Sequence, residues 1–170
     1  MREEIQLAAA QLIGNPLWGC GRAADMATFQ FGPRTERIDR HGKAYWVGEF
    51  ALHVQCPWRI VREDGVVVGS QDLYYPAEYD PKIGVPEEFD WNRDPTRCYH
   101  LLSALFDNET REFIVQAIDV GSAGGVRVLL NHGLALEVFP CDSLEREHWR
   151  LFKLGSEEKH FVVTGNGIES

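Results

Sequence analysis

The stretch GEFALHVQCPWRI, residues 48–60, alternates apolar and polar side chains and decides the fold of this chain. Successive side chains of a β-strand point to opposite faces, so a two-residue rhythm is typical of a strand with one buried face. The rhythm begins at Trp46, and we expect its even positions to face the core, although Pro57 can introduce a bulge that changes the alternation beyond it. The even positions are Trp46, Gly48, Phe50, Leu52, Val54, Cys56, Trp58 and Ile60.

The odd positions of this stretch form a candidate ligand-binding face, in which a small alanine lies among larger polar side chains. Glu49 and His53 are about 13 Å apart along a strand, so they make no acid–base pair without a cross-strand neighbour. His53 and Cys56 fall on opposite faces, so we expect no metal site and no catalytic pair. The alternative is the solvated face of a half-buried sheet. The candidate ligand-binding residues are Glu49, His53, Gln55 and Arg59.

The rest of the chain predicts a mainly β (α+β) fold, an antiparallel β-sandwich or barrel-like meander. Ile5, Ala8, Ala9, Leu12 and Ile13 share one face at helical spacing, which predicts an N-terminal helix that ends at Gly14-Asn15-Pro16. Short helices are expected at 95–106 and 143–148. Expected strands are 26–31, 44–55, 58–61, 66–69, 112–120, 126–131, 134–139, 149–154 and 160–164, joined by short Gly-rich turns.

Composition limits the classes of function. The 170 residues suit a single globular domain over residues 1–170, and the net charge is −9. Residues 22–62 hold seven Lys or Arg against four acids, whereas residues 63–119 hold four against thirteen. Because nucleic-acid binders need clustered cations, this balance argues against nucleic acid and favours a basic protein partner. The alternative is that the acids only keep the protein soluble.

The N-terminus and the cysteines point to a cytoplasmic protein. The opening MREEIQLAAAQLIG is acidic and too polar for a signal peptide or a membrane span. The cysteines Cys20, Cys56, Cys98 and Cys141 are widely and unevenly spaced, so we expect free thiols instead of a zinc ribbon or a disulfide framework. We expect no cofactor.

The segment 74–97, YYPAEYDPKIGVPEEFDWNRDPTR, predicts a long irregular loop with a partner-binding surface. Its four prolines exclude a long helix or a central strand, and its aromatic side chains argue against disorder. Acids interleave with the rings, a mixture that suits docking on a basic protein surface. Alternatively, the rings fold back to cap an open end of the β structure. The candidate partner-binding residues are Tyr79, Glu87, Glu88, Phe89, Asp90, Trp91 and Asp94.

Several spaced stretches resemble a family of uncharacterised bacterial proteins. They are GEFALHVQCPWRI at 48–60, GSQDLYYP at 69–76, LEVFPCDSLEREHWRLF at 136–152 and HFVVTGNGI at 160–168. In size and charge the chain is also similar to immunity proteins that neutralise polymorphic toxins. The resemblance implies a binding role and assigns no functional residue.

Three functions therefore remain open. The first is an acidic protein-interaction module, such as an immunity-type inhibitor, that binds a basic partner through the 74–97 segment. The second is a β protein that holds a small ligand in a cavity. The third is an enzyme that uses His53, Gln55 and Arg59 with partners from neighbouring strands. The sequence does not predict the oligomeric state.

Overall fold

The structure, a computed structural model, describes residues 1–107 and 111–169. Two α-helices, α1 (Arg2–Ala9) and α2 (Arg97–Phe106), accompany three short 3-10 helices: η1 (Ala10–Leu12), η2 (Ser70–Tyr74) and η3 (Asn131–Gly133). The strands are β1 (Pro16–Ala23), β2 (Met26–Ile38), β3 (Ala44–Val54), β4 (Trp58–Arg62), β5 (Gly65–Gly69), β6 (Phe113–Val120), β7 (Val126–Leu130), β8 (Ala135–Val138), β9 (Glu147–Lys153), β10 (Phe161–Thr164) and β11 (Gly167–Glu169).

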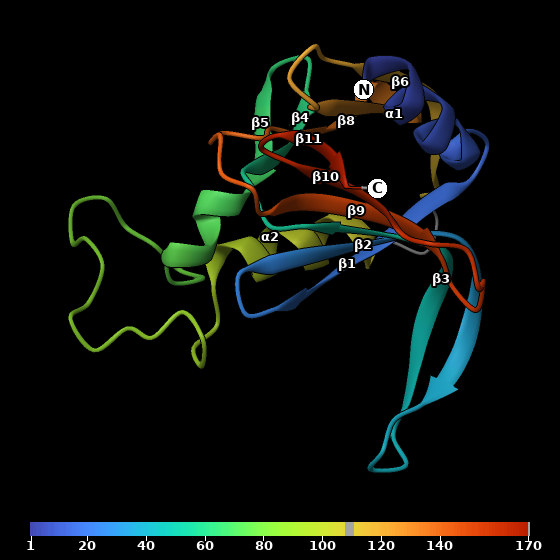
Figure 1. Ribbon diagram of the computed structural model, residues 1–170. Coiled ribbons are helices and arrows are strands. Elements are labelled where there is room, and N and C mark those ends of the chain that lie inside the picture. Colours follow the sequence, from blue (N-terminus) through green and yellow to red (C-terminus); the bar gives the residue numbers. More distant parts are fainter. Residues whose placement is uncertain (108–110, 170) are drawn as a thin grey trace.

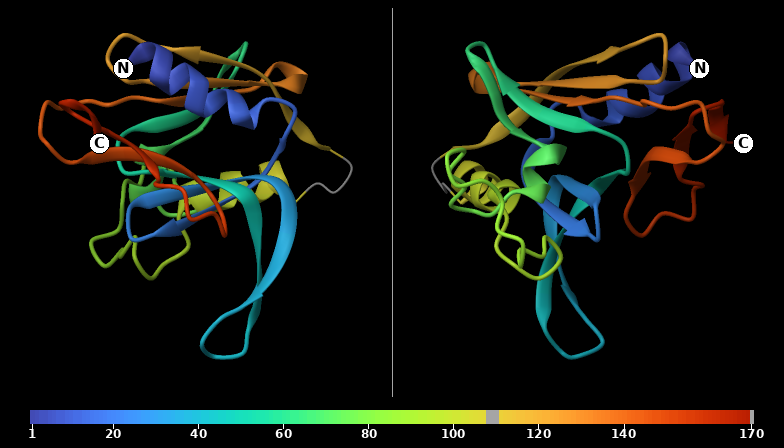
Figure 2. Two further views of the ribbon diagram at one scale, coloured as in Figure 1. Left: turned by 45° about the vertical axis from the view of Figure 1, so that its right-hand side comes forward. Right: turned by 90° about the vertical axis from the view of Figure 1, so that its left-hand side faces the viewer.

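The strands form two facing antiparallel layers, which confirms the mainly β prediction. The hydrogen-bonded order is β11-β10-β9-β3-β2-β1-β6-β7-β8-β4-β5. The strands from β11 to β1 make one layer and those from β6 to β5 make the other (Figures 1 and 2). The layers are joined where Leu17 and Pro16 of β1 pair with Phe113 and Ile114 of β6. The chain also crosses between layers at residues 55–57, which connect β3 directly to β4.

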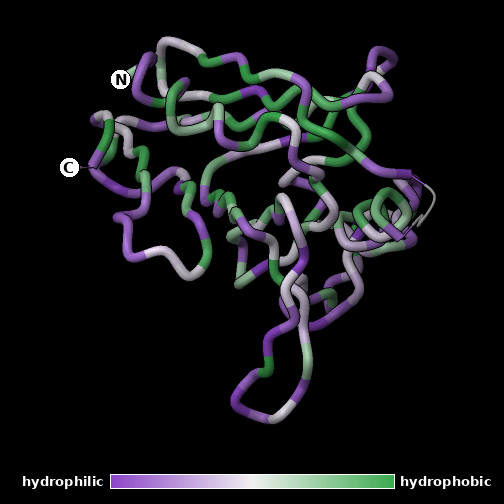
Figure 3. Tube along the Cα trace, turned by 90° about the vertical axis from the view of Figure 1, so that its right-hand side faces the viewer, coloured by the Kyte–Doolittle hydropathy of each residue, from purple (hydrophilic) through white to green (hydrophobic). Residues whose placement is uncertain are grey.

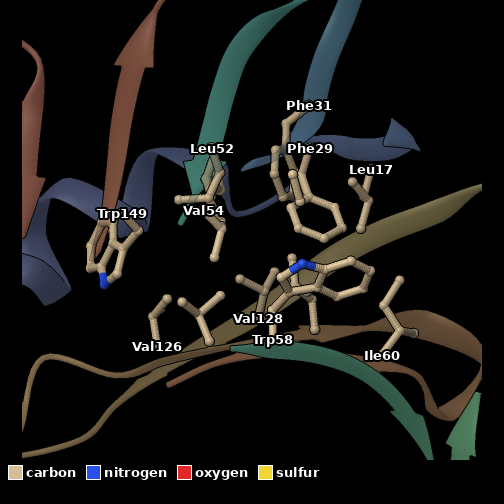
Figure 4. Close-up of a cluster of buried hydrophobic side chains, with 14 of the residues drawn as sticks. Leu17, Phe29, Phe31, Leu52, Val54, Trp58, Ile60, Val126, Val128 and Trp149 are labelled. Carbon is tan, nitrogen blue, oxygen red and sulfur yellow. The ribbon is translucent and has the colours of Figure 1, made fainter. Parts of the chain in front are cut away.

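The core fills the space between these layers. Leu52, Val54 and Phe29 approach it from one layer, and Val128 and Trp58 from the other (Figure 4). The rings of Phe29 and Trp58 meet edge to face, with centroids 5.0 Å apart, and both side chains are buried. The even positions of residues 48–60 therefore face inward as predicted, on both sides of Pro57.

The two α-helices pack at the margins of the core. Ile5, Ala9 and Leu12 of the predicted helix face are buried, whereas Ile13 is 46% exposed because the chain is already extended there. Gln6 Nε2 donates a hydrogen bond to the Ile118 carbonyl oxygen of β6 at 3.1 Å. Helix α2 packs against η2, β5 and β1. It begins after Thr96, whose hydroxyl oxygen accepts from the Tyr99 backbone N–H at 3.2 Å.

Part of the β2–β3 hairpin leaves the sandwich as a projecting arm, residues 34–48 (Figures 1 and 2). A bulge at residues 32–33 precedes it, because Phe31 pairs with Phe50 but the next partners are Arg34 and Gly48. Strand β3 pairs with β9 only over Phe50–Val54, so both edges of the arm are open. Much of the arm is hydrophilic (Figure 3).

The arm overturns one expectation and extends another. Trp46 belongs to the inward series of the sequence, yet its side chain is 56% exposed. The reason is that the second layer does not reach the arm, so nothing covers its face. Strand β2 was expected to end at Phe31 but continues to Ile38 beyond the bulge.

One further expectation is wrong, and two strands were missed. Residues 143–146 form no helix: the Asp142 carboxylate accepts from the Leu144 backbone N–H at 3.0 Å and pairs with Arg146, which holds bends that lead directly into β9. His148, the second residue of β9, is 1% exposed, and its Nε2 lies 3.2 Å from the Asp142 carbonyl oxygen. Strands β1 and β11 were not predicted. Among the described residues, no helix has the length and apolarity needed to cross a membrane.

Candidate functional site

The predicted 74–97 segment forms a closed excursion that we call the acidic loop, residues 75–96. It leaves the body of the protein after η2 and returns at the start of α2 (Figure 1). Two backbone hydrogen bonds close its neck, from the Ala77 N–H to the Pro95 carbonyl oxygen at 3.0 Å and from the Arg97 N–H to the Tyr75 carbonyl oxygen at 2.8 Å. The ends of the loop are therefore fixed to the fold.

The aspartates of the acidic loop build its turns. The Asp80 carboxylate accepts from the Lys82 backbone N–H, and the Asp94 carboxylate accepts from that of Asp90 at 2.8 Å. Asp90 accepts from the Asn92 backbone N–H at 2.9 Å and forms an ion pair with Arg93 at 2.7 Å. The Asn92 hydrogen bond, followed by Arg93, lowers the pKa of Asp90 below its usual value. Asp90 and Asp94, two predicted contacts, thus shape the loop.

The glutamates of the acidic loop remain free for a partner. Glu78, Glu87 and Glu88 are all exposed. Among the described residues of this loop, the ion pair is the one between Asp90 and Arg93, and none of the three glutamates takes part in it. The loop as a whole carries six acids against two Lys or Arg, a net charge of −4. The charge available for a partner is therefore concentrated on its glutamates.

One of the predicted aromatic contacts, Trp91, anchors the acidic loop to the body, and another, Tyr79, packs within the loop. The Trp91 ring packs edge to face against Tyr74, with centroids 5.4 Å apart, and the Arg22 guanidinium lies 5.8 Å from its centroid. Arg22 Nη2 also donates to the Trp91 carbonyl oxygen at 3.0 Å. Tyr79 packs against Tyr75 at 4.7 Å. These rings fix the loop in place.

The outward apolar surface of the loop was missed by the sequence reasoning. Ile83 is 81% exposed and Val85 45% exposed. A nearby pocket, the loop pocket, has a volume of about 440 Å³ and combines three prolines and Phe89 with three carboxylates. The signal in the sequence was an isolated apolar pair between prolines, without periodicity. The pocket is lined by Pro76, Ala77, Glu78, Pro86, Glu88, Phe89, Asp94 and Pro95.

The candidate ligand-binding face around His53 has mainly aromatic and basic neighbours. His53 pairs with Arg150 of β9 across the sheet, and its ring packs edge to face on Phe152 at 4.9 Å. Phe152 stacks in turn on His160 at 4.2 Å. Burial, followed by Arg150, lowers the pKa of His53 and favours the neutral imidazole. Among the described residues, no ion pair joins an acid to this ring, and Glu147 of the same region pairs with Arg150.

The structure does not bring the four residues of that face together. Arg59 lies on β4 in the other layer, where it pairs with Glu137 at 2.6 Å. Glu49 pairs with Lys153 at 2.9 Å. Gln55 is exposed at the crossing between layers, and its backbone N–H donates to the His148 carbonyl oxygen. The arrangement is that of separate cross-strand contacts.

Metal and thiol chemistry has little support. In the described part of the chain, no group of three His, Cys, Asp or Glu side chains is placed to hold a metal ion. All four cysteines are free thiols. Burial raises the pKa of Cys56 to about 12, so this thiol is protonated at neutral pH and unsuited to act as a nucleophile.

Comparison of the chain with known protein families, with curated proteins and with solved structures found no match. The resemblance to a bacterial family gains no support from these comparisons.

Proposed function

We propose that this protein is an interaction module that binds a basic protein partner through the acidic loop. The observation that carries the proposal is the division of labour among the loop acids: the aspartates hold the turns, while Glu78, Glu87 and Glu88 are exposed. An immunity-type inhibitor is one form that such a module takes.

The loop pocket suits an arginine or lysine side chain of the partner. Long basic side chains pack their methylene stems on apolar surface while the charged group stays at its edge. In this pocket the stem would lie on the prolines and Phe89, and the cation would meet Glu78, Glu88 and Asp94. Arginine fits best, because its planar guanidinium pairs with carboxylates and also packs on aromatic rings.

The exposed apolar residues of the loop would add an apolar contact beside these charges. Ile83 and Val85 lie in the same loop as Glu87 and Glu88, so a partner can cover apolar surface next to the charges. Protein interfaces commonly have an apolar centre and a polar rim. Since Tyr74, Trp91 and the neck fix the loop, it loses little conformational entropy on binding.

A paired-variant capture experiment tests the proposal. The immobilised protein is compared with Glu87→Gln/Glu88→Gln in capture from a lysate of its source organism, read by mass spectrometry. The matched control is Glu157→Gln/Glu158→Gln, which removes the same charge from another exposed Glu-Glu pair, in the β9–β10 connection. We expect a basic protein to be retained by the wild type and the control, and to fall at least about tenfold for the loop variant.

The salt dependence gives an independent measurement. Retention of the basic partner should fall strongly between about 0.1 M and 0.5 M salt, because exposed charges are screened. Thermal melting confirms that each variant is folded. If the two Glu-Glu variants retain the same proteins equally, or if the captured protein is acidic, the acidic loop is not the binding surface.

A further inference from the structure

A second cavity lies behind the acidic loop, where α2 and η2 meet the β1–β2 hairpin. Its volume is about 420 Å³, within the range of roughly 300–1,000 Å³ that is typical of small-molecule sites. Asp94 and Pro95 separate it from the loop pocket, since they line both. We call it the helix cavity. Its interior belongs to the body of the protein and is distinct from the proposed partner surface.

The interior of the helix cavity is mainly apolar. Trp58, Leu73 and Leu102 line it, and all three are buried in the core. Such side chains offer a ligand dispersion contacts and a surface that gains from losing water. Cys20 and Cys98 add two small polarisable thiols. Most of the cavity surface is therefore available to the apolar part of a ligand.

Two hydroxyl groups supply the polar contacts of the cavity. The Ser70 hydroxyl oxygen accepts from the Trp58 backbone N–H at 3.3 Å, and the Thr96 hydroxyl oxygen accepts from the Tyr99 backbone N–H at 3.2 Å. A hydroxyl group that accepts can also donate its own proton. Both residues therefore suit a ligand oxygen that accepts a hydrogen bond.

The charged side chains that line the helix cavity are balanced, Arg22 and Arg93 against Asp25 and Asp94, and both arginines are engaged. Arg22 donates to the carbonyl oxygens of Ala24 at 2.9 Å and Trp91 at 3.0 Å, and Arg93 pairs with Asp90. Burial raises the pKa of Cys98 to about 12 and also raises that of Cys20, so both thiols are neutral at physiological pH. An anionic ligand would lose its hydration here without gaining an unengaged cation.

We infer that the helix cavity is a binding site for a neutral, mainly apolar small molecule that carries a carbonyl, ether or hydroxyl oxygen. The apolar body lies against Trp58, Leu73 and Leu102, and the oxygen accepts from Ser70 or Thr96. Most of the lining comes from β1, β2, β4, η2 and α2, and the end of the acidic loop adds Arg93, Asp94, Pro95 and Thr96, so the cavity lies next to the surface proposed for the partner.

Two dyes with the same ring system test the preference of the cavity for a neutral, apolar ligand. N-phenyl-1-naphthylamine is neutral and fluoresces in apolar surroundings, whereas 8-anilinonaphthalene-1-sulfonate adds one negative charge. We expect the neutral dye to bind with one molecule per chain, and the sulfonate to bind at least about tenfold more weakly. Equal or tighter binding of the sulfonate, or no binding of the neutral dye, overturns the proposal.

A pair of variants at one position tests the location. Cys98→Met extends a longer side chain from the cavity wall and should weaken the neutral dye at least about tenfold, whereas Cys98→Ala removes only the thiol and should retain binding within about threefold. The same affinity in both variants and the wild type would place the dye elsewhere.

Alkylation of the unmodified protein gives a measurement that needs no variant. The neutral dye should slow the reaction of Cys20 and Cys98 with N-ethylmaleimide at least about fivefold, read from the peptides by mass spectrometry. Cys56 and Cys141 do not line the cavity, so their rates serve as internal controls and should not change. Protection of all four thiols, or of none, contradicts the site.

Discussion

The arm and the acidic loop both leave the sandwich, yet they differ in charge and in what holds their shape. The arm carries four Lys or Arg against two acids, a net charge of +2, whereas the acidic loop carries −4. The arm is a two-stranded ladder in which residues 34–38 pair with 44–48 through the backbone. The loop has no such ladder, and its turns depend on the side chains of Asp80, Asp90 and Asp94.

The two segments should therefore tolerate substitutions at different positions. Backbone ladders form with almost any side chain, so the arm should accept most substitutions that leave its root and its turn intact. The acidic loop should be sensitive at the few side chains that make its turns and anchors.

The largest effect on stability should distinguish the two tryptophans at opposite ends of the alternating stretch, residues 46–60. Trp58 is 5% exposed and meets Phe29 in the core, whereas Trp46 in the arm is 56% exposed. Trp58→Ala should lower the free energy of unfolding by about 3–5 kcal/mol, because it leaves a cavity. Trp46→Ala should change it by no more than about 0.5 kcal/mol. Urea denaturation of both variants measures the difference.

Equal losses for the two variants would contradict the exposed placement of Trp46 and would mean that another surface covers the arm. A concentration dependence of the midpoint would then identify a second copy of the chain as that surface.

The same pair of tryptophans shows how much of the fold the sequence can predict. A two-residue rhythm states which side of a strand a residue occupies, and this was sufficient to predict the inward series from Phe50 to Ile60. It does not state whether a second layer covers that side. Coverage depends on where β9 and β4 lie, which is long-range information, so Trp46 was placed wrongly.

The next effect should arise at the root of the arm. A Cβ atom on Gly48 would clash with the Phe31 carbonyl oxygen and lie 2.8 Å from the Phe31 backbone nitrogen, where neither can move without breaking the β2–β3 ladder. Gly48→Ala should cost about 2 kcal/mol of unfolding free energy. Gly19→Ala is the matched control, because a Cβ there has no neighbour within 4 Å. A Gly48→Ala variant as stable as that control would refute the tight root.

Only part of the candidate site could be predicted from the sequence. Proline spacing and aromatic content predicted a long structured loop, because these residue types act locally. The division between turn-forming aspartates and free glutamates could not be predicted, since Asp94 accepts from the Asp90 backbone only once the turn is formed. The helix cavity was also beyond prediction, because it joins Cys20, Ser70 and Cys98 from distant segments.

A smaller effect should follow from releasing the anchor of the acidic loop. Trp91→Ala removes the ring contacts with Tyr74 and with the Arg22 guanidinium, so the loop should open locally at a cost of about 1–2 kcal/mol. Hydrogen exchange and limited proteolysis should both increase within residues 78–94. Trp46→Ala, which alters the arm, is the control and should leave the loop protected. Unchanged hydrogen exchange in the loop of Trp91→Ala would show that the neck and the turns hold the loop closed without the ring contacts.

The smallest effect concerns the titration of Asp90. Its folded-state pKa is lowered, so the contribution of its hydrogen bonds is present at neutral pH and is lost as the pH falls through that lowered value. NMR titration of the carboxyl carbon should therefore give a pKa below the usual range, and the Asn92 amide should shift at the same pH. Because the Asn92 hydrogen bond is the first cause and Arg93 a later one, Arg93→Ala should restore only part of the usual value. Complete restoration in that variant would mean that the ion pair, and not the backbone turn, holds the carboxylate in place.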